Sequence, residues 1–375
     1  MKIKILALFA LLIISVNAQN DTIMYFEDYD PPSTLVVPEH IVTQAKYPFI
    51  DVHNHQWNYT EEYFSELLKK MDSLNMAYMV NLSGRGFRRL EGGGFALQEP
   101  AYMTDAIKMV NEKFDSRIIF FTNVDFNNID ETGWTDKAVA QLEEDVKNGA
   151  KGLKIYKGLG MGTQDSKGNR VAVDDARIDP VWAKCGELGI PVLIHTADPA
   201  QFWQPMDKNN ERWLELKTHP GRYRDPAANP SFEQLITEQH NVFRKHPGTK
   251  FINAHLGWLG QDLGRLGKLL DELPNVYTEI GAVLYEIGRQ PRFAREFFIK
   301  HQDRIMMGKD SWRPEEYHSY FRVLETADEY FDYYRRYHAF WKLYGVDLPD
   351  EVLKKVYYKN ALNVIPGIDK SKFPD

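Results

Sequence analysis

The sequence predicts an α/β fold built as a (β/α)8 barrel. Short apolar runs of strand length recur eight times along the chain, and longer stretches with helical periodicity lie between them. Strands that alternate with helices predict a parallel sheet, and eight such units favour closure into a barrel. The rival fold is an open doubly wound sheet, but no Gly-x-Gly-x-x-Gly motif follows the first strand.

The expected strands are the apolar runs at residues 49–53, 76–82, 117–124, 152–156, 191–195, 250–255, 275–280 and 304–308. The expected helices lie at residues 61–74, 102–114, 136–148, 180–188, 232–245, 262–273 and 292–300, with a last one at 352–362. Because the strands of a barrel converge, side chains at their carboxyl ends can meet at one site.

The first 18 residues are typical of a secretory signal peptide. Lys2 and Lys4 form a basic start, residues 5–16 are apolar, and small residues precede a cleavage site after Ala18. A membrane anchor is the alternative, but the apolar stretch is too short to span a bilayer comfortably. We expect four segments, namely a signal peptide at 1–18, an extended N-terminal segment at 19–46, the barrel domain at 47–366 and a C-terminal tail at 367–375.

Cysteine content and net charge indicate the cellular compartment of the protein and the class of its partners. The single cysteine, Cys185, excludes an intramolecular disulfide, which for an exported chain favours a bacterial periplasm or outer surface. The formal net charge of −7 argues against nucleic acid, whose binding needs clustered positive charge. No later segment is apolar enough to cross a membrane. We expect a periplasmic or secreted protein that acts on a small molecule and does not insert stably into a membrane.

Two predicted loops, after strands five and eight, exceed the usual length. Both follow strand carboxyl ends, the face where barrel active sites lie. Residues 196–230 carry Trp203, while residues 311–349 carry Trp312 and a predicted helical run through 333–336. Such loops are commonly lids or substrate walls, so both tryptophans are candidate substrate-binding residues. The alternatives are ordinary surface and the contact of a homo-oligomer.

His53-Asn54-His55 closes the first predicted strand. Alternate strand residues share a face, so Asp51, His53 and His55 are expected to point the same way. Two imidazoles that converge at a strand end suit a divalent metal such as zinc. A lone His-x-His motif is weak, because short histidine pairs recur by chance, and partners elsewhere in the chain must decide.

Three further side chains lie at the ends of predicted strands. His195 ends the fifth strand, His255 ends the sixth, and Asp310 follows the eighth. Any one of these histidines could be a satisfied core residue. All three residues nevertheless fall at the same end of the barrel as His53 and His55, and packing alone does not explain that coincidence.

With these residues in this order, the chain resembles the amidohydrolase superfamily, and specifically its amidohydrolase-related (amidohydrolase-2) branch. That branch includes decarboxylases, lactonases and hydratases. The stretches that carry the resemblance are Asp51-Val52-His53-Asn54-His55, Ile194-His195-Thr196, Ala254-His255-Leu256-Gly257, Pro274-Asn275-Val276-Tyr277, Met307-Gly308-Lys309-Asp310 and Tyr358-Lys359-Asn360-Ala361. The resemblance covers about residues 47–366 and implies a distorted (β/α)8 barrel with a metal at the strand carboxyl ends.

The resemblance also implies a role for each site residue. His53, His55 and His195 correspond to metal ligands. Asp310 corresponds to a carboxylate that binds the metal and shuttles a proton, and His255 corresponds to a catalytic histidine that often orients water or substrate instead of binding metal. The branch is usually mononuclear, so one divalent metal ion is expected, Zn2+ first and Mn2+ as the alternative.

Two lysines leave alternatives open. Lys154, in the fourth strand, could bridge two metals as a carboxylated lysine, bind a substrate carboxylate or form a structural ion pair, and the last two are favoured. Lys309 stands where the related enzymes commonly have threonine. Strand alternation turns Lys309 away from Asp310, but in a loop its ammonium would repel the metal.

Arg85, after the second strand, and Arg289, after the seventh, are candidate clamps for a substrate carboxylate, which arginine binds through paired donors. We expect an exported metal-dependent hydrolase whose metal-activated water attacks a lactone, ester or amide of a small carboxylated or sugar-derived substrate. One alternative is a metal-dependent decarboxylase or lyase on the same site. The other is a non-catalytic barrel that only binds a ligand.

Overall fold

The structure is a computed structural model that describes residues 24–25, 28–89, 91, 95–338 and 340–374. Two compact units divide the chain, Met1–Thr34 and Leu35–Asp375. The expected signal peptide, residues 1–18, lies outside the described residues. All helices and strands named below belong to the second unit.

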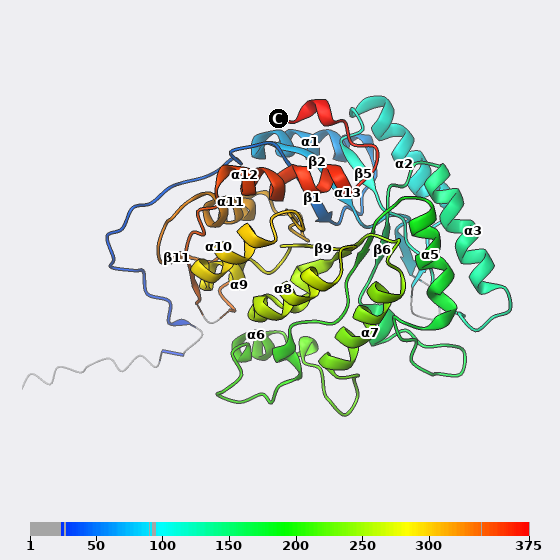
Figure 1. Ribbon diagram of the computed structural model, residues 1–375. Helices are drawn as coiled ribbons and strands as arrows, with labels where there is room; N and C mark the ends of the chain where they lie inside the picture. The colour runs from blue at the N-terminus through cyan, green and yellow to red at the C-terminus, as the bar shows by residue number, and fades with distance from the viewer. Residues whose placement is uncertain (1–23, 26–27, 90, 92–94, 339, 375) are drawn as a thin grey trace, which may run out of the picture. The chain divides into compact units, whose positions relative to one another are not determined.

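Eight parallel strands of the described chain form the centre of this unit (Figure 1). They are β1 (Phe49–Asn54), β2 (Met76–Asn81), β5 (Ile118–Phe120), β6 (Leu153–Ile155), β7 (Val192–Ile194), β8 (Phe251–Asn253), β9 (Val276–Glu279) and β10 (Ile305–Met306). They coincide with the eight expected runs, but most are shorter, because regular pairing stops before the chain turns into the loops.

Main-chain hydrogen bonds connect the strands in the orders β1-β2-β5 and β6-β7-β8-β9-β10. Further bonds join these two sets. Between β5 and β6, the Thr122 N–H donates to the Gly152 carbonyl and the Lys154 N–H donates to the Thr122 carbonyl, both at 2.8 Å. Beside β1 and β10, the Val52 N–H donates to the Met307 carbonyl at 3.0 Å. The strands therefore follow one another in chain order, and the expected distorted (β/α)8 barrel is confirmed.

Helices lie outside the strands (Figure 1). The longer ones are α1 (Glu61–Leu74), α2 (Pro100–Lys113), α3 (Trp134–Lys147), α5 (Asp179–Glu187), α7 (Phe232–Lys245), α8 (Leu263–Glu272) and α10 (Pro291–Lys300). The expected last helix is divided into α12 (Asp350–Lys354), a π-helical turn at Lys355–Lys359 and α13 (Asn360–Val364). Short helices α4 (Gly158–Met161) and α9 (Leu284–Arg289) follow β6 and β9.

Helix α1 illustrates how the sequence determines these elements. The Thr60 hydroxyl caps its first turn, and Asn75 ends it in a left-handed conformation with φ of 62°. Phe64, Leu67 and Met71 recur at helical spacing and are buried. Burial of each such side chain contributes roughly 1.5–3 kcal/mol of hydrophobic stabilisation.

The two long loops contain structure of their own. They hold a 3-10 turn at Ala200–Trp203, α6 (Trp213–Thr218), α11 (Tyr317–Glu325), and a hairpin of β11 (Phe331–Asp332) and β12 (Lys342–Leu343). The expected helical run through residues 333–336 is wrong. Phe331 pairs with Leu343 in an antiparallel arrangement, so the residues between them connect the two strands of a hairpin.

A second hairpin, β3 (Phe87–Arg89) with β4 (Phe95–Leu97), corresponds to no expected strand. Three residues are too few for a strand periodicity to be recognised in a sequence. Within the described part of the chain, every helix is too short or too polar to cross a bilayer.

Candidate metal centre

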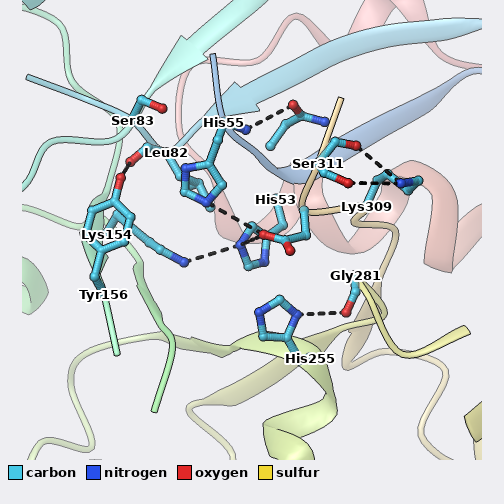
Figure 2. A network of polar contacts seen from close by, with 12 residues as sticks. His53, His55, Leu82, Ser83, Lys154, Tyr156, His255, Gly281, Lys309 and Ser311 are labelled. Atoms are coloured by element: carbon cyan, nitrogen blue, oxygen red, sulfur yellow. Dashed lines mark hydrogen bonds and ion pairs between the residues drawn. The ribbon is translucent and has the colours of Figure 1, made fainter. Parts of the chain in front are cut away.

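His53 is the penultimate residue of β1, and its side chain is fully buried at the carboxyl end of the barrel (Figure 2). Its Nδ1 lies 2.9 Å from Oε1 of Glu279. A carboxylate only accepts hydrogen bonds, so Nδ1 carries the proton and Nε2 presents a lone pair. That lone pair faces Oδ1 of Asp310 and Nζ of Lys154, each at 3.3 Å.

Glu279 is a site residue that the sequence analysis did not single out. It ends β9, is buried, and accepts hydrogen bonds from the main-chain N–H groups of His255 at 2.6 Å and Gly281 at 2.5 Å. The pKa of Glu279 is raised by burial, and the neighbouring His255 and the two N–H donors offset only part of this effect. Its signal in the sequence is a carboxylate at the end of an apolar run, at the same end of the barrel as the histidines.

Asp310 and His55 complete a group of three with His53. The Asp310 N–H donates to the His53 carbonyl at 2.6 Å, which ties the loop after β10 to β1. Nε2 of His55 lies 3.8 Å from Oδ1 of Asp310. One ligand atom from each of the three residues lies within 4.8 Å of the other two. The structure therefore brings together three of the four expected metal ligands.

His255 follows β8 in a left-handed conformation with φ of 58°. Its Nδ1 lies 2.7 Å from the Gly281 carbonyl (Figure 2). A carbonyl only accepts, so Nδ1 is the donor and Nε2 is the ring nitrogen left for other contacts. A second group of close ligand atoms consists of His53, His255 and Glu279.

His195 follows β7 and lies at the same site. Its ring centroid is 4.4 Å from that of His255, and its Nε2 is buried without a hydrogen-bond partner among the described residues. In the part of the chain that the structure describes, His195 belongs to neither group of ligand atoms within 4.8 Å. This fourth expected ligand therefore lies close to the centre but outside both groups of mutually close ligand atoms.

Burial keeps the imidazoles neutral. It lowers the pKa of His55 to about 3 and those of His53 and His195 well below their usual value, and the Lys154 ammonium lowers all three further. Burial alone would raise the pKa of Asp310, but the surrounding histidines and Lys154 hold it below its usual range. Neutral imidazoles and an ionised carboxylate are the protonation states that bind a divalent metal.

Lys154 is buried beside these ligands, with Nζ 5.5 Å from the centroid of the Tyr156 ring. Burial lowers the pKa of Lys154 to about 8, although Asp310 and Glu279 act in the opposite direction. Among the described residues, no carboxylate oxygen lies within 4.0 Å of Nζ, so the structural ion pair considered for Lys154 is not formed. Its Nζ lies instead 3.3 Å from Nε2 of His53.

The donor set fits a divalent metal. His53 Nε2 and Asp310 Oδ1 are both acceptors 3.3 Å apart, a contact that requires a positive charge beside it, either the Lys154 ammonium at 3.3 Å from Nε2 or a metal ion. Two ligand atoms bound at ~2.0–2.2 Å to a tetrahedral zinc ion are themselves about 3.3–3.5 Å apart. A metal here would be held by His53, His55 and Asp310, with the unpartnered Nε2 of His195 available to extend the set.

Asp51 does not join His53 and His55, contrary to the expectation that all three share a face. Its carboxylate accepts hydrogen bonds from the Tyr317 hydroxyl at 2.5 Å and from the Asn54 amide at 2.8 Å. The register of β1 against β2 is irregular between Asp51 and Asn54, so simple alternation does not hold there.

Lys309 lies away from the metal centre, as strand alternation predicted. Its Nζ donates to Glu316 at 2.5 Å. It also donates to Ser311 at 3.3 Å (Figure 2). Burial lowers the pKa of the Lys309 ammonium, and Glu316 opposes that effect. The Lys309 ammonium is therefore paired with Glu316 and does not contact the metal ligands.

A cavity of about 200 Å3 opens beside Asp310. His195 and His255 contribute to its wall from the metal centre, while Arg212 and Arg335 contribute from the two long loops. The expectation that these loops form substrate walls agrees with this placement. Four of the residues expected to bind substrate, namely Arg85, Arg289, Trp203 and Trp312, lie outside its lining.

The two expected arginine clamps are committed to the protein and lie outside the lining of this cavity. Arg85 donates to the Gln98 carbonyl at 3.0 Å. Arg289 pairs with Glu286 at 3.0 Å and stacks on Trp341 at 3.6 Å, beside a separate cavity of about 710 Å3. A position after a strand was therefore not sufficient to place an arginine in the lining of this cavity.

The two expected tryptophans also lie outside that lining. The Trp203 indole donates to the Pro230 carbonyl at 2.9 Å, and the Trp312 ring packs against Tyr317 with centroids 5.8 Å apart. Phe202, the neighbour of Trp203, lines the cavity instead.

A barrel with neutral histidines and a carboxylate gathered at its carboxyl end belongs to the class of metal-dependent barrel enzymes. The model of the amidohydrolase family, described as "Amidohydrolase", matches residues 50–366, most of the chain. The chain therefore belongs to the amidohydrolase family, and the resemblance inferred from its motifs is confirmed. No curated protein matches it.

Solved structures share the fold. An uncharacterised TIM-barrel protein from Bordetella bronchiseptica is 15% identical, with a TM-score of 0.50 over 84% of this chain and 97% of that one. A 2,6-dihydroxybenzoate decarboxylase in complex with 2,6-dihydroxybenzoate is 14% identical, with a TM-score of 0.50 over 85% and 99%. A dihydroxybenzoic acid decarboxylase from Polaromonas sp. JS666, with bound manganese and 2-nitroresorcinol, is 14% identical, with a TM-score of 0.51 over 85% and 96%. At these identities the likeness shows the fold alone.

Proposed function

We propose that this protein is an exported metal-dependent hydrolase that attacks a lactone, ester or amide of a small carboxylated or sugar-derived substrate. The observation that carries the proposal is the group of His53, His55 and Asp310, whose ligand atoms lie within 4.8 Å of one another beside a cavity. We propose one divalent ion at this group, zinc or alternatively manganese. The manganese bound in the Polaromonas decarboxylase supports the second choice.

Asp310 and His255 have separate roles in the proposed reaction. A divalent ion held by His53, His55 and Asp310 would lower the pKa of a water from near 16 to about 7 and so make hydroxide available at neutral pH. Asp310 stays ionised, so it is the group that takes a proton from the water and returns it to the leaving group. His255 can accept a hydrogen bond at Nε2, because Nδ1 is committed to Gly281, and this orients the water.

Metal analysis of the purified full chain tests the proposal. We expect about one equivalent of zinc or manganese per chain, which His53→Ala removes because it deletes the ligand shared by both groups of ligand atoms. His240→Ala, on α7, is the matched control and should keep the metal. A wild-type protein that hydrolyses its substrate without metal would sink the mechanism.

The decarboxylase or lyase alternative uses the same parts, with Asp310 moving a proton to or from carbon. A panel of small lactones, esters, amides and carboxylated aromatic compounds separates the two reactions. Release of carbon dioxide indicates a decarboxylase, whereas release of acid or amine without carbon dioxide indicates a hydrolase. The non-catalytic alternative predicts a lost ligand set, and His53, His55 and Asp310 are all in place.

Export is a separate part of the proposal. It is supported by the basic and apolar residues of the first 18 positions. N-terminal sequencing of the protein recovered from the periplasm or medium should begin at Gln19. Recovery of the intact chain from the cytoplasm alone would contradict export without affecting the proposed chemistry.

A further inference from the structure

The cavity beside Asp310 is lined by four cationic side chains, and three of them pair with a carboxylate of the protein. Lys157 pairs with Asp198 at 2.6 Å. Arg212 and Arg222 share Glu215, each donating to a different carboxylate oxygen at 2.5 Å. The fourth cation is Arg335.

Arg212 shows that such a cavity cation is fully engaged by hydrogen bonds and ion pairs within the protein. Its side chain is buried, and besides Glu215 it donates to the Tyr285 hydroxyl at 2.6 Å. Its guanidinium carbon also lies 4.6 Å from the centroid of the Tyr285 ring. A substrate anion would have to compete with a buried carboxylate to reach this guanidinium, so Arg212 is a structural part of the wall.

Arg335 has a different environment. It lies between β11 and β12, partly buried, with its guanidinium carbon 5.6 Å from the centroid of the Tyr334 ring. Within the residues that the structure describes, no carboxylate oxygen lies within 4.0 Å of its guanidinium, and its side chain makes no hydrogen bond. A cation that lines a cavity without a counter-ion loses hydration, and a tyrosine ring offsets only part of that loss, so a ligand anion would stabilise it.

We propose that Arg335 binds the carboxylate of the substrate, so that the substrate class is a small molecule with one free carboxylate beside the reacting group. The inference rests on the proposed function for the assumption that this cavity holds the substrate. Arg335 is the guanidinium of this cavity wall that has no carboxylate partner among the described residues, so it is available to pair with an anionic ligand. The planar donor pairs of arginine also match the two oxygens of a carboxylate.

Calorimetric titration of the metal-loaded full chain with benzoate, benzamide and phenyl phosphate tests the assignment. We expect Arg335→Gln to weaken benzoate binding by about 10- to 100-fold, the effect of losing a charge-assisted pair of hydrogen bonds, and to leave benzamide unchanged. Arg335→Lys should keep part of the benzoate affinity. Arg336→Gln is the matched control, since Arg336 is the exposed neighbour, and it should bind benzoate as the wild type does.

Equal benzoate affinity in wild type and Arg335→Gln would overturn the assignment. So would a wild type that binds no benzoate, an equal loss of benzamide, or tighter binding of phenyl phosphate than of benzoate. The melting temperature and metal content of each variant show whether it is folded. If Arg335→Gln does not fold, Arg335→Lys and Arg336→Lys are compared instead, and equal affinity in that pair also overturns it.

Failure of the proposed function gives a different result. A wild type without metal that still binds benzoate through Arg335 would contradict the metal-dependent hydrolase and leave the carboxylate site in place. A metal-loaded, active wild type whose benzoate affinity does not depend on Arg335 would contradict only the carboxylate site.

Discussion

The carboxylate of Glu279 lies 2.9 Å from Nδ1 of His53 and fixes which nitrogen of that ring carries the proton. As a result, Nε2 of His53 presents its lone pair to Asp310. The same carboxylate accepts the His255 N–H at 2.6 Å, so one residue of β9 orients groups from β1 and from the end of β8. A partner of this kind sets the affinity of a metal site as much as the ligands do.

We predict that Glu279→Gln weakens metal binding by about 10- to 100-fold, because the amide loses the charge that holds the His53 ring. Competition with a coloured zinc chelator measures the dissociation constant. Glu272→Gln, an exposed position on α8, is the control and should bind zinc as the wild type does. Unchanged zinc affinity in Glu279→Gln would show that the hydrogen bond does not orient the ligand.

Gly308→Ala should displace Glu279 or His53 and so weaken the metal centre. A Cβ at this position would lie 2.2 Å from Oε2 of Glu279 and 3.1 Å from Cβ of His53, so one of the two must move. We expect weaker zinc binding together with a stability loss of about 1–3 kcal/mol, as measured by urea unfolding.

The matched control for that change is Gly162→Ala. A Cβ at Gly162 meets no atom within 4 Å, so stability and zinc affinity should stay near those of the wild type. If Gly308→Ala and Gly162→Ala behave alike, the close approach of Gly308 to Glu279 has no energetic role.

The carboxylate of Glu215, in the loop after β7, should make the free energy of unfolding depend on pH in the acid range. Burial alone would raise the pKa of Glu215, but His338 and Arg212 lower it to about 2. Because the folded pKa is below the unfolded one, this contribution is complete above about pH 4.5 and is lost as the pH falls towards 2.

The measurement is urea unfolding of wild type and Glu215→Gln between about pH 7 and pH 3. The difference in the free energy of unfolding should be largest at neutral pH, where the variant leaves the buried Arg212 without its partner, and should shrink in acid. Exposed Glu131→Gln serves as the control. A difference that stays constant with pH would contradict the low pKa.

Removal of metal should lower thermal stability. A ligand present at about 1,000 times its dissociation constant stabilises the folded state by about 4 kcal/mol, so a chelator should lower the melting temperature of the metal-loaded wild type. His53→Ala should melt at the same temperature with and without chelator, since it has no metal to lose. A chelator effect of equal size in both proteins would place the metal elsewhere.

The positions of the histidines followed from the sequence alone, because they depend on local order. Apolar runs of strand length alternate with helical periodicity, and His53, His195 and His255 each stand at or just beyond the end of such a run. Parallel strands in a barrel bring these ends to one face, so the site could be located before any coordinate was known.

The choice of partners depended on the tertiary structure. Arg85 and Arg289 also follow strands, yet Gln98 and Glu286 engage them, while Arg335 lines the cavity from a hairpin that the sequence did not predict. Glu279 became a site residue only when closure of the barrel placed β9 near β1. The physical reason is that periodicity fixes the face and end of an element that a side chain occupies, whereas hydrogen bonds and ion pairs form between elements far apart in the chain, and only the folded packing determines which of them meet.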